Sequence, residues 1–393
     1  MRRLKIGVIG VGRRSRAHLP VISRMTDMYD FVAVCDVQAN RAKQVAEEYH
    51  VKAYSNVERM LEKEELDVVD IVVPGEAHHV IAKVVAEHGT SMLVETPIGV
   101  TLPCIDLMIK AADKAGVKLE VAENVWRFVE ERMKAEIIKS GVIGEVSRAY
   151  VINTWGAYHA MNAIRNYVGF AEARRVVGFE QHSPIKEIKG RWGRSFTVDD
   201  WTKGVIEFEN GIIGVHEISF VGWWTRLLRT TRYTEVDGSE GCIINNDVHL
   251  VENGMDKVYT MRMITSKVNG IEVFEGMELD TEPKVVWKNP FKRYNIPADG
   301  PVSDRVAVTD ELSSIGNAVL NDTEPSYGAL NGRKDQELSI AIHESALNGN
   351  KVIKIPIETI TSYEKRIHEQ FKEKYGHDIL EVDELIETFF GQR

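Results

Sequence analysis

The sequence predicts a two-domain protein: an α/β domain with a doubly wound parallel sheet, then an α+β domain with an open, mostly antiparallel sheet. The first prediction rests on the regular alternation of short apolar strands and helical patterns up to about residue 120. The second rests on a change of pattern near Ser147, after which strands joined by a hairpin signal become frequent. A length of 393 residues fits two or three domains.

The strands expected in the first domain are short, and segments such as Asp70-Ile71-Val72-Val73 are almost wholly apolar. Apolar runs of this kind are typical of parallel strands whose two faces are both covered by helices. The predicted strands are Leu4–Ile9, Phe31–Cys35, Val68–Val73, Met92–Glu95 and Lys118–Ala122. The predicted helices include Arg41–Tyr49, Val57–Glu62, His79–Glu87 and Ile105–Ala115.

The second domain is expected to combine an antiparallel sheet with a few helices. Glu209-Asn210-Gly211 lies between two apolar segments and indicates a hairpin. Strands are predicted at Val205–Phe208, Gly214–Phe220 and Lys351–Ile355, and helices at Val129–Lys139, Asp310–Leu320 and Arg333–Leu347. We therefore expect domains at residues 1–123 and 124–360, followed by a charged tail at residues 361–393.

The tail carries one apolar stripe, Tyr363, Ile367 and Phe371, at helical spacing. A helix of this kind is expected to cover a neighbouring surface of the same chain, and an oligomer contact is the alternative.

Composition and charge narrow the class of protein. The net charge of −10 argues against non-specific binding to nucleic acid, which needs a basic field. Cys35, Cys104 and Cys242 lie far apart, as expected in a reducing compartment. No apolar run approaches the roughly 20 residues that span a bilayer, and the apolar start of the chain is better interpreted as a first strand than as an export signal. We expect a cytoplasmic protein without membrane contact.

The first strand leads directly into the turn Gly10-Val11-Gly12-Arg13-Arg14-Ser15 and then into a helix. Gly10 allows a tight turn, and Gly12 lets backbone N–H groups approach a pyrophosphate at the helix N-terminus. Ser15 stands where a third glycine is usual, and it is small enough for close packing of helix and strand. This order of strand, glycines and helix predicts a Rossmann domain that binds a dinucleotide.

Asp36 ends the second strand, where a carboxylate accepts hydrogen bonds from both hydroxyls of the adenosine ribose. The same carboxylate repels a 2′-phosphate, so the predicted cofactor is NAD rather than NADP. Arg41 lies nearby and is an alternative partner for a phosphate, although we interpret it as an inert surface residue.

The order of several short motifs resembles the Gfo/Idh/MocA family of oxidoreductases over residues 4 to 356. The motifs are Gly10-Val11-Gly12, Ala17-His18, Asp70–Pro74 with His78, Val94-Glu95-Thr96-Pro97, Glu123–Phe128, His159 with Asn162 and Arg165, Phe208–Gly211, Gly238–Gly241 and Glu344-Ser345-Ala346. The resemblance implies that a sugar or cyclitol is the substrate, bound between the two domains. It also implies a homodimer or homotetramer formed through the second sheet.

The resemblance also assigns loops to the cofactor. Pro74 and His78 follow the strand at residues 68–73, and Glu95 and Pro97 follow the next strand. By resemblance these residues, together with Asn124, lie beside NAD. His78 is alternatively a residue that only packs at the start of its helix. No group of His, Cys, Asp or Glu has metal-ligand spacing, so no metal site is predicted.

Two family signatures depart from the usual pattern here. Thr96 stands where members that transfer hydride carry a Lys, and Thr lacks both the charge and the tunable pKa of Lys. Trp155 stands where an Asp precedes the family's His by four positions, while His159 itself is present. His159 is therefore our acid/base candidate because imidazole titrates near neutral pH. Thr96, Tyr158 and Glu123 are the accompanying catalytic candidates.

A further group of residues is assigned to the substrate. Arg127 suits a substrate carboxylate, and the aromatic rings are suited to stacking on a sugar. The substrate candidates are Trp126, Arg127, Asn153, Trp155 and Asn162. A salt bridge within the core is the alternative role for Arg127, and core packing is the alternative for the tryptophans.

These observations lead to one main functional hypothesis and two alternatives. The main hypothesis is an NAD-dependent oxidoreductase that acts on a secondary alcohol of a sugar, glycoside or cyclitol, with His159 as acid/base. The first alternative is an NAD-using lyase, glycoside hydrolase or epimerase that passes through a transient keto sugar without net redox. The second is a regulatory protein that binds NAD without turnover.

Overall fold

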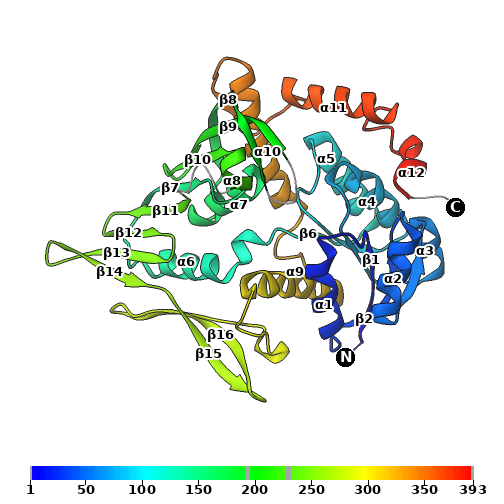
Figure 1. The fold of residues 1–393 in the computed structure, drawn as a ribbon, viewed down its shortest axis with the longest axis horizontal. Helices are drawn as coiled ribbons and strands as arrows, with labels where there is room; N and C mark the ends of the chain where they lie inside the picture. The colour runs from blue at the N-terminus through cyan, green and yellow to red at the C-terminus, as the bar shows by residue number, and fades with distance from the viewer. Residues whose placement is uncertain (1, 191–194, 226–231, 391–393) are drawn as a thin grey trace. The chain divides into compact units, whose positions relative to one another are not determined.

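The computed structural model describes residues 2–190, 195–225 and 232–390. The chain divides into two compact units. Unit 1 contains Met1–Asn124, Pro301–Gln336 and Glu364–Arg393, and unit 2 contains Val125–Gly300 and Glu337–Tyr363. Figure 1 labels many of the helices and strands of both units, coloured by residue number.

The sheet of unit 1 has six strands in the order β3-β2-β1-β4-β5-β6, and every neighbouring pair is parallel. The strands are β1 (Leu4–Ile9), β2 (Tyr29–Cys35), β3 (Lys52–Tyr54), β4 (Val68–Ile71), β5 (Ser91–Val94) and β6 (Leu119–Val121). The strand order reverses between β1 and β4. The crevice at the carboxyl ends of these two strands is where ligands of such sheets bind. The predicted doubly wound parallel sheet is confirmed.

Helices cover both faces of this sheet. The helices of unit 1 are α1 (Ser15–Arg24), α2 (Ala39–Tyr49), α3 (Val57–Lys63), α4 (His78–Glu87), α5 (Leu102–Ala115), α9 (Val302–Asn321), most of α11 (Ser362–Tyr375) and α12 (Val382–Phe390). Helix α12 packs on α4. Right-handed crossovers in opposite directions from β1 and β4 place α1 and α4 on opposite faces. Helix α5 packs beside α4, and α9 packs beside α1 and against β5 and β6.

The placement of residues 301–336 differs from the predicted division, which assigned them to the second domain. Val306 and Leu312 of α9 are buried in unit 1. Just beyond α9, the backbone N–H of Val121 in β6 donates to the carbonyl of Tyr327 at 3.0 Å. The apolar pattern of α9 predicts a helix, but it does not say which apolar surface the helix covers.

Unit 2 is built on a nine-stranded sheet in the order β14-β13-β12-β11-β7-β10-β9-β8-β18. Only β7 and β10 pair in parallel within it, so the predicted mostly antiparallel sheet is confirmed. Its strands are β7 (Val146–Ile152), β8 (Ala173–Lys189), β9 (Ser195–Phe208), β10 (Ile213–Ser219), β11 (Tyr233–Gly238), β12 (Gly241–Ile244), β13 (Asp247–Glu252), β14 (Met255–Thr260) and β18 (Ile353–Lys354). A second, antiparallel sheet contains β15 (Arg262–Val268), β16 (Ile271–Leu279) and β17 (Val285–Lys288).

The predicted hairpin joins β9 to β10, and Gly211 at its tip has a φ of +82°. The helices of this unit are α6 (Val129–Ser140), α7 (Ala157–Tyr167), α8 (Phe220–Thr225) and most of α10 (Ala329–Leu347). Helix α7 packs on β7 and β10. Gly214 of β10 allows this close approach, because a Cβ atom there would lie 2.5 Å from Ile164 of α7.

Candidate functional site

The turn between β1 and α1 depends on its two glycines in different ways. Gly10 has a φ of +88°, and a Cβ atom there would lie 2.3 Å from the carbonyl oxygen of Val72. Only glycine fits that position. A Cβ atom on Gly12 would meet nothing closer than a guanidinium nitrogen of Arg41 at 3.9 Å. The space at Gly12 is therefore open, as required for a ligand to approach the backbone.

Ser15 begins α1 and is fully buried. Its hydroxyl donates to the carbonyl oxygen of Gly12 at 2.8 Å. Ser15 is therefore packed against the turn and supports it through a hydrogen bond.

Asp36 lies directly after β2, and its carboxylate is fixed beside the glycine turn. One oxygen accepts from the backbone N–H of Val11 at 3.0 Å, and the other accepts from that of Gln38 at 2.9 Å. Arg41 also donates to this carboxylate at 3.1 Å. Arg41 is therefore engaged with Asp36 rather than being an isolated surface residue. Asp36 and Arg41 thus form an ion pair at the position where the sequence predicts ribose binding.

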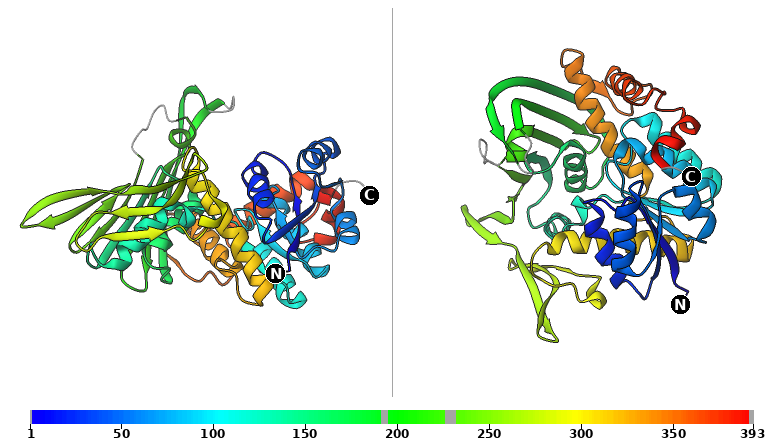
Figure 2. Two further views of the ribbon diagram at one scale, coloured as in Figure 1. Left: turned by 90° about the horizontal axis from the view of Figure 1, so that it is seen from below. Right: turned by 45° about the vertical axis from the view of Figure 1, so that its right-hand side comes forward.

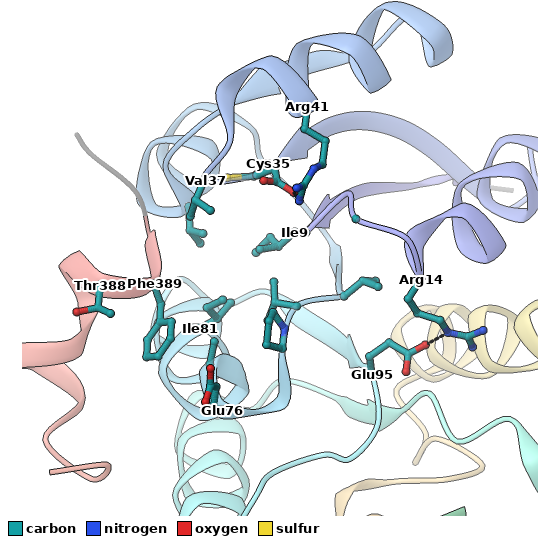
Figure 3. Close-up of a pocket in the computed structure, with 18 of the residues that line it drawn as sticks. Ile9, Arg14, Cys35, Val37, Arg41, Glu76, Ile81, Glu95, Thr388 and Phe389 are labelled. Carbon is teal, nitrogen blue, oxygen red and sulfur yellow. Dashed lines mark hydrogen bonds and ion pairs between the residues drawn. The ribbon is translucent and has the colours of Figure 1, made fainter. Parts of the chain in front are cut away.

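A cavity of about 640 Å³ opens at the carboxyl ends of the strands in unit 1. Figure 3 shows side chains converging on it from several elements, with Arg14 and Glu95 at one end and Val37, Ile81 and Phe389 at the other. The predicted site residues that line it are Gly10, Gly12, Arg13, Arg14, Asp36, Pro74, Glu95 and Thr96. The glycine turn, the β2 carboxylate and the loop after β5 thus share one cavity.

Four other residues assigned to the cofactor, Ser15, His78, Pro97 and Asn124, are not among those that line this cavity. The buried ring of His78 has one nitrogen 2.9 Å from the carbonyl of Val73 and the other 3.0 Å from that of Pro97. His78 therefore joins the loops after β4 and β5. The amide of Asn124 donates to Asp304 at 3.2 Å.

Behind the cavity lies a buried network of charges. The ring of His18 contacts Asp70 at 2.9 Å and Glu95 at 3.0 Å, and Arg14 makes an ion pair with Glu95. Burial alone would lower the pKa of His18, but the carboxylates around it outweigh that effect and raise its pKa to about 10. Burial would raise the pKa of Glu95, but Arg14 and His18 hold it well below its usual range. Glu95 is therefore ionised and His18 protonated near neutral pH.

Replacement of His18 by Gln is expected to cost a few kcal/mol of stability at neutral pH, and progressively less as the pH rises. A histidine with a pKa of 6.5 when unfolded and about 10 when folded stabilises the fold fully below pH 6.5 and loses that effect toward pH 10. Urea unfolding of both proteins across this range measures the difference. A difference that does not change with pH would contradict a protonated His18.

The residues assigned to acid/base chemistry belong to different units. Thr96 and Glu123 belong to unit 1, whereas Tyr158 and His159 lie in the first turn of α7 in unit 2. The amide and hydroxyl of Thr96 both donate to Glu95, at 2.8 and 3.2 Å. Glu123 is buried and does not line the cavity. His159 is partly exposed, with its ring edge-on to that of Tyr158 at 5.9 Å.

Several substrate candidates have a clear structural role in unit 2. Asn162 is buried and accepts from the backbone N–H of Trp126 at 3.0 Å, and Asn153 accepts from that of Ser219 at 2.8 Å. Arg127 is fully buried, with its guanidinium 4.8 Å from the centre of the Trp126 ring. Trp155 is partly exposed in the segment before α7. Of the five substrate candidates, Trp126 and Trp155 are the partly exposed ones.

Sequence reasoning missed part of the cavity wall. Val37 and Ile81 line it, as do Tyr375, Thr388 and Phe389 of the tail. Val37 could have been predicted, because it follows Asp36 directly and Asp36 was assigned to the adenosine ribose. The tail offered only the apolar stripe of α11, which does not indicate what the helix covers.

Two kinds of feature are absent from the part of the chain that the structure describes. No three or more His, Cys, Asp or Glu side chains gather there in a way that suits a metal ion. No helix in the same residues is both long and apolar enough to span a membrane.

Residues 4–123 match the model of the GFO_IDH_MocA oxidoreductase family, NAD-binding Rossmann fold. The chain is 25% identical over 262 residues to a D-apiose dehydrogenase of Paraburkholderia graminis, which covers 62% of this chain and 68% of that protein. It is 27% identical over 168 residues to an inositol 2-dehydrogenase of Salmonella paratyphi B, which covers 41% of this chain and 50% of that protein.

A solved oxidoreductase from Agrobacterium radiobacter, in complex with NAD⁺, L-tartaric acid and magnesium, has a similar fold. Its TM-score is 0.68 at 17% identity, and the match covers 90% of this chain and 99% of that one. The family match includes the glycine turn, Asp36 and the loop after β5, all of which line the cavity. Residues 4–123 therefore form an NAD-binding Rossmann domain of the Gfo/Idh/MocA oxidoreductase type.

Proposed function

We propose that this protein oxidises a secondary alcohol of a sugar, glycoside or cyclitol and transfers the hydride to NAD, with His159 as the acid/base. The observation that carries the proposal is that one cavity in unit 1 runs from Asp36 past the glycine turn to Glu95 and Thr96. The relatives named D-apiose dehydrogenase and inositol 2-dehydrogenase support a polyhydroxylated substrate.

The residues of the cavity fit NAD. The open space at Gly12 admits a phosphate close to the backbone, and Arg13 brings a positive charge to the same turn. Asp36 offers a fixed carboxylate for the ribose hydroxyls. NAD, when bound, supplies the hydride acceptor.

The proton chemistry must come from the protein. Glu95 is held ionised by Arg14 and His18, so it does not exchange protons near neutral pH. Thr96 donates its hydroxyl hydrogen to Glu95, which leaves the oxygen of Thr96 as an acceptor for a substrate hydroxyl. Neither residue can take up the alcohol proton. We assign that step to the imidazole of His159, whose intrinsic pKa suits it.

A panel of sugars, glycosides and cyclitols, each incubated with the full chain and NAD, tests this proposal. Formation of NADH together with a ketone product supports it. Products without net formation of NADH would instead support a reaction with transient oxidation, in which the hydride returns to the substrate. The presence of Thr96 in the position of the family's Lys favours this second candidate.

Replacement of Asp36 by Asn is expected to weaken NAD binding by about 10- to 100-fold, because hydrogen bonds to a charged group contribute roughly 1.5–3 kcal/mol. The same change releases Arg41 from its pair with Asp36, so binding of NADP should become tighter. Titration of wild type and variant with both nucleotides gives the two affinities. The double variant D36N/R41Q is the control and should lose the gain for NADP. Unchanged preference in D36N would contradict the role of Asp36.

We also propose that the chain forms a homodimer or homotetramer through the nine-stranded sheet. Phe179 of β8 and Val198 of β9 are exposed on this sheet, as are Val251 of β13 and Val258 of β14. Apolar residues in such positions are typical of interaction surfaces. Light scattering of the purified chain measures the assembly, and a monomer at micromolar concentration would contradict it.

The cytoplasm is our proposed location. The free cysteines support it, because Cys35 and Cys104 are buried thiols of unit 1 and Cys242 lies in unit 2. Fractionation of cells that express the chain tests this location, and recovery outside the cytoplasm would contradict it.

A further inference from the structure

The C-terminal tail is attached to unit 1 at several points. The buried carboxylate of Glu364 in α11 accepts from the backbone N–H of Leu102 at the start of α5, at 2.8 Å. The ring of His79 in α4 contacts the carbonyl of Ile379 at 2.6 Å, and Lys83 forms an ion pair with Asp383 at 3.1 Å. Figures 1 and 2 show α12 lying beside α4. The tail is therefore packed against unit 1 and belongs to its fold.

Three residues of the tail reach the nucleotide cavity: Tyr375 at the end of α11, and Thr388 and Phe389 of α12. Tyr375 donates its hydroxyl to Glu76, and Lys374 donates to the same carboxylate at 2.7 Å. Glu76 itself lines the cavity. The tail is thus linked to the loop after β4 at the edge of the site.

An aromatic cluster holds Phe389 in place. Its ring lies 5.2 Å from that of Tyr375, at an interplanar angle of 62°, and the ring of Tyr375 lies 4.6 Å from that of Phe371. Phe371 is buried, whereas Phe389 is partly exposed. Figure 3 shows Phe389 projecting toward the cavity near Ile81, on the side where Val37 lies. An apolar surface with a flat ring is therefore presented to the cavity.

We propose that the tail forms the outer wall of the adenine subsite, with Phe389 as its main contact. Asp36 marks the position of the adenosine ribose, so the apolar end of the cavity beyond it is the end that receives the base. That end contains Val37, Ile81 and Phe389. A flat heterocycle gains from burial of its faces against such side chains. The inference rests on the proposed binding of NAD in this cavity.

The proposal predicts different effects for ligands that contain the adenosine half of NAD and for ligands that contain only the nicotinamide half. Arg14, Glu95 and Thr96 line the opposite end of the cavity from the tail (Figure 3). Changes in the tail should therefore weaken binding of any ligand that contains adenosine and leave binding of nicotinamide mononucleotide unchanged. ADP-ribose, which lacks the nicotinamide, is the diagnostic probe.

The test compares Phe389→Ala with Leu380→Ala in the full chain. Leu380 is an exposed residue of the same tail, and it does not line the cavity. Base–aromatic stacking contributes roughly 1–3 kcal/mol on alanine substitution, so the Kd of F389A for both NAD and ADP-ribose should rise about 10- to 100-fold. L380A should match wild type. Phe389→Leu retains apolar packing without the flat ring, and its Kd should rise less than that of F389A.

Titration calorimetry and thermal unfolding together decide the result. The proposal is supported if F389A and F389L are folded, bind NAD and ADP-ribose more weakly than wild type, and bind nicotinamide mononucleotide as wild type does. If the wild-type protein binds NAD but both variants bind ADP-ribose with wild-type affinity, the tail does not form the wall of the adenine subsite. Absence of NAD binding in wild type would refute the proposed function itself.

Discussion

Replacement of His159 by Asn is expected to lower kcat by about 10²- to 10⁴-fold, the usual contribution of a positioned general acid/base. The side chain of Asn can still form hydrogen bonds, but it cannot take up a proton. NAD affinity should not change, because His159 lies in unit 2 and does not line the nucleotide cavity of unit 1. Steady-state kinetics with a substrate from the panel, together with NAD titration, separate the two effects.

Tyr158→Phe is the matched control for the His159 variant. Tyr158 is the adjacent residue of α7, and it is buried, with its ring edge-on to that of His159. Loss of its hydroxyl should change kcat far less than loss of the imidazole. Full activity in H159N would contradict our assignment, and comparable losses in the two variants would show that the hydroxyl of Tyr158 has a chemical role.

Replacement of Gly12 by Val is expected to weaken NAD binding by about 100-fold or more without destabilising the fold. A side chain at this position projects into open space, where its nearest neighbour is Arg41 at 3.9 Å from the Cβ atom. It would fill the space through which a pyrophosphate approaches the backbone. Calorimetric titration with NAD and urea unfolding measure the two properties on the same preparation.

Gly10→Ala is the contrasting variant at the same turn. Its Cβ atom would lie 2.3 Å from the carbonyl of Val72, and its φ of +88° is unfavourable for alanine. We expect this variant to lose stability as well as affinity. Normal NAD affinity in G12V, or equal instability in both variants, would contradict the distinct roles of the two glycines.

The strands of unit 1 could be predicted because their residues are apolar on both faces. Strands β1 and β5 were predicted to within a residue or two. β4 ends at Ile71, two residues earlier than predicted, because Val72 and Val73 are apolar residues of the loop that lines the cavity. β3 was missed, since its three residues, Lys52–Tyr54, are not buried.

Part of the candidate site could also be predicted. Gly10, Gly12, Asp36 and Glu95 lie at the carboxyl ends of predicted strands, and the topology of a parallel sheet brings such positions together. The tail residues of the cavity could not be predicted. Helix α12, which carries Phe389, packs beside α4 although the two helices lie some 300 positions apart, and the sequence pattern does not indicate this contact. Arg127 and Asn162 were predicted to bind substrate, and both are buried in unit 2. A buried polar side chain with a structural role has the same appearance in sequence as one that binds a ligand.

The most direct test of the account is a calorimetric titration of the full chain, stripped of any retained nucleotide, with NAD and then with NADP. We expect one NAD to bind per chain and NADP to bind at least about 10-fold more weakly, because of Asp36. Failure to bind either nucleotide, or tighter binding of NADP than of NAD, would contradict it.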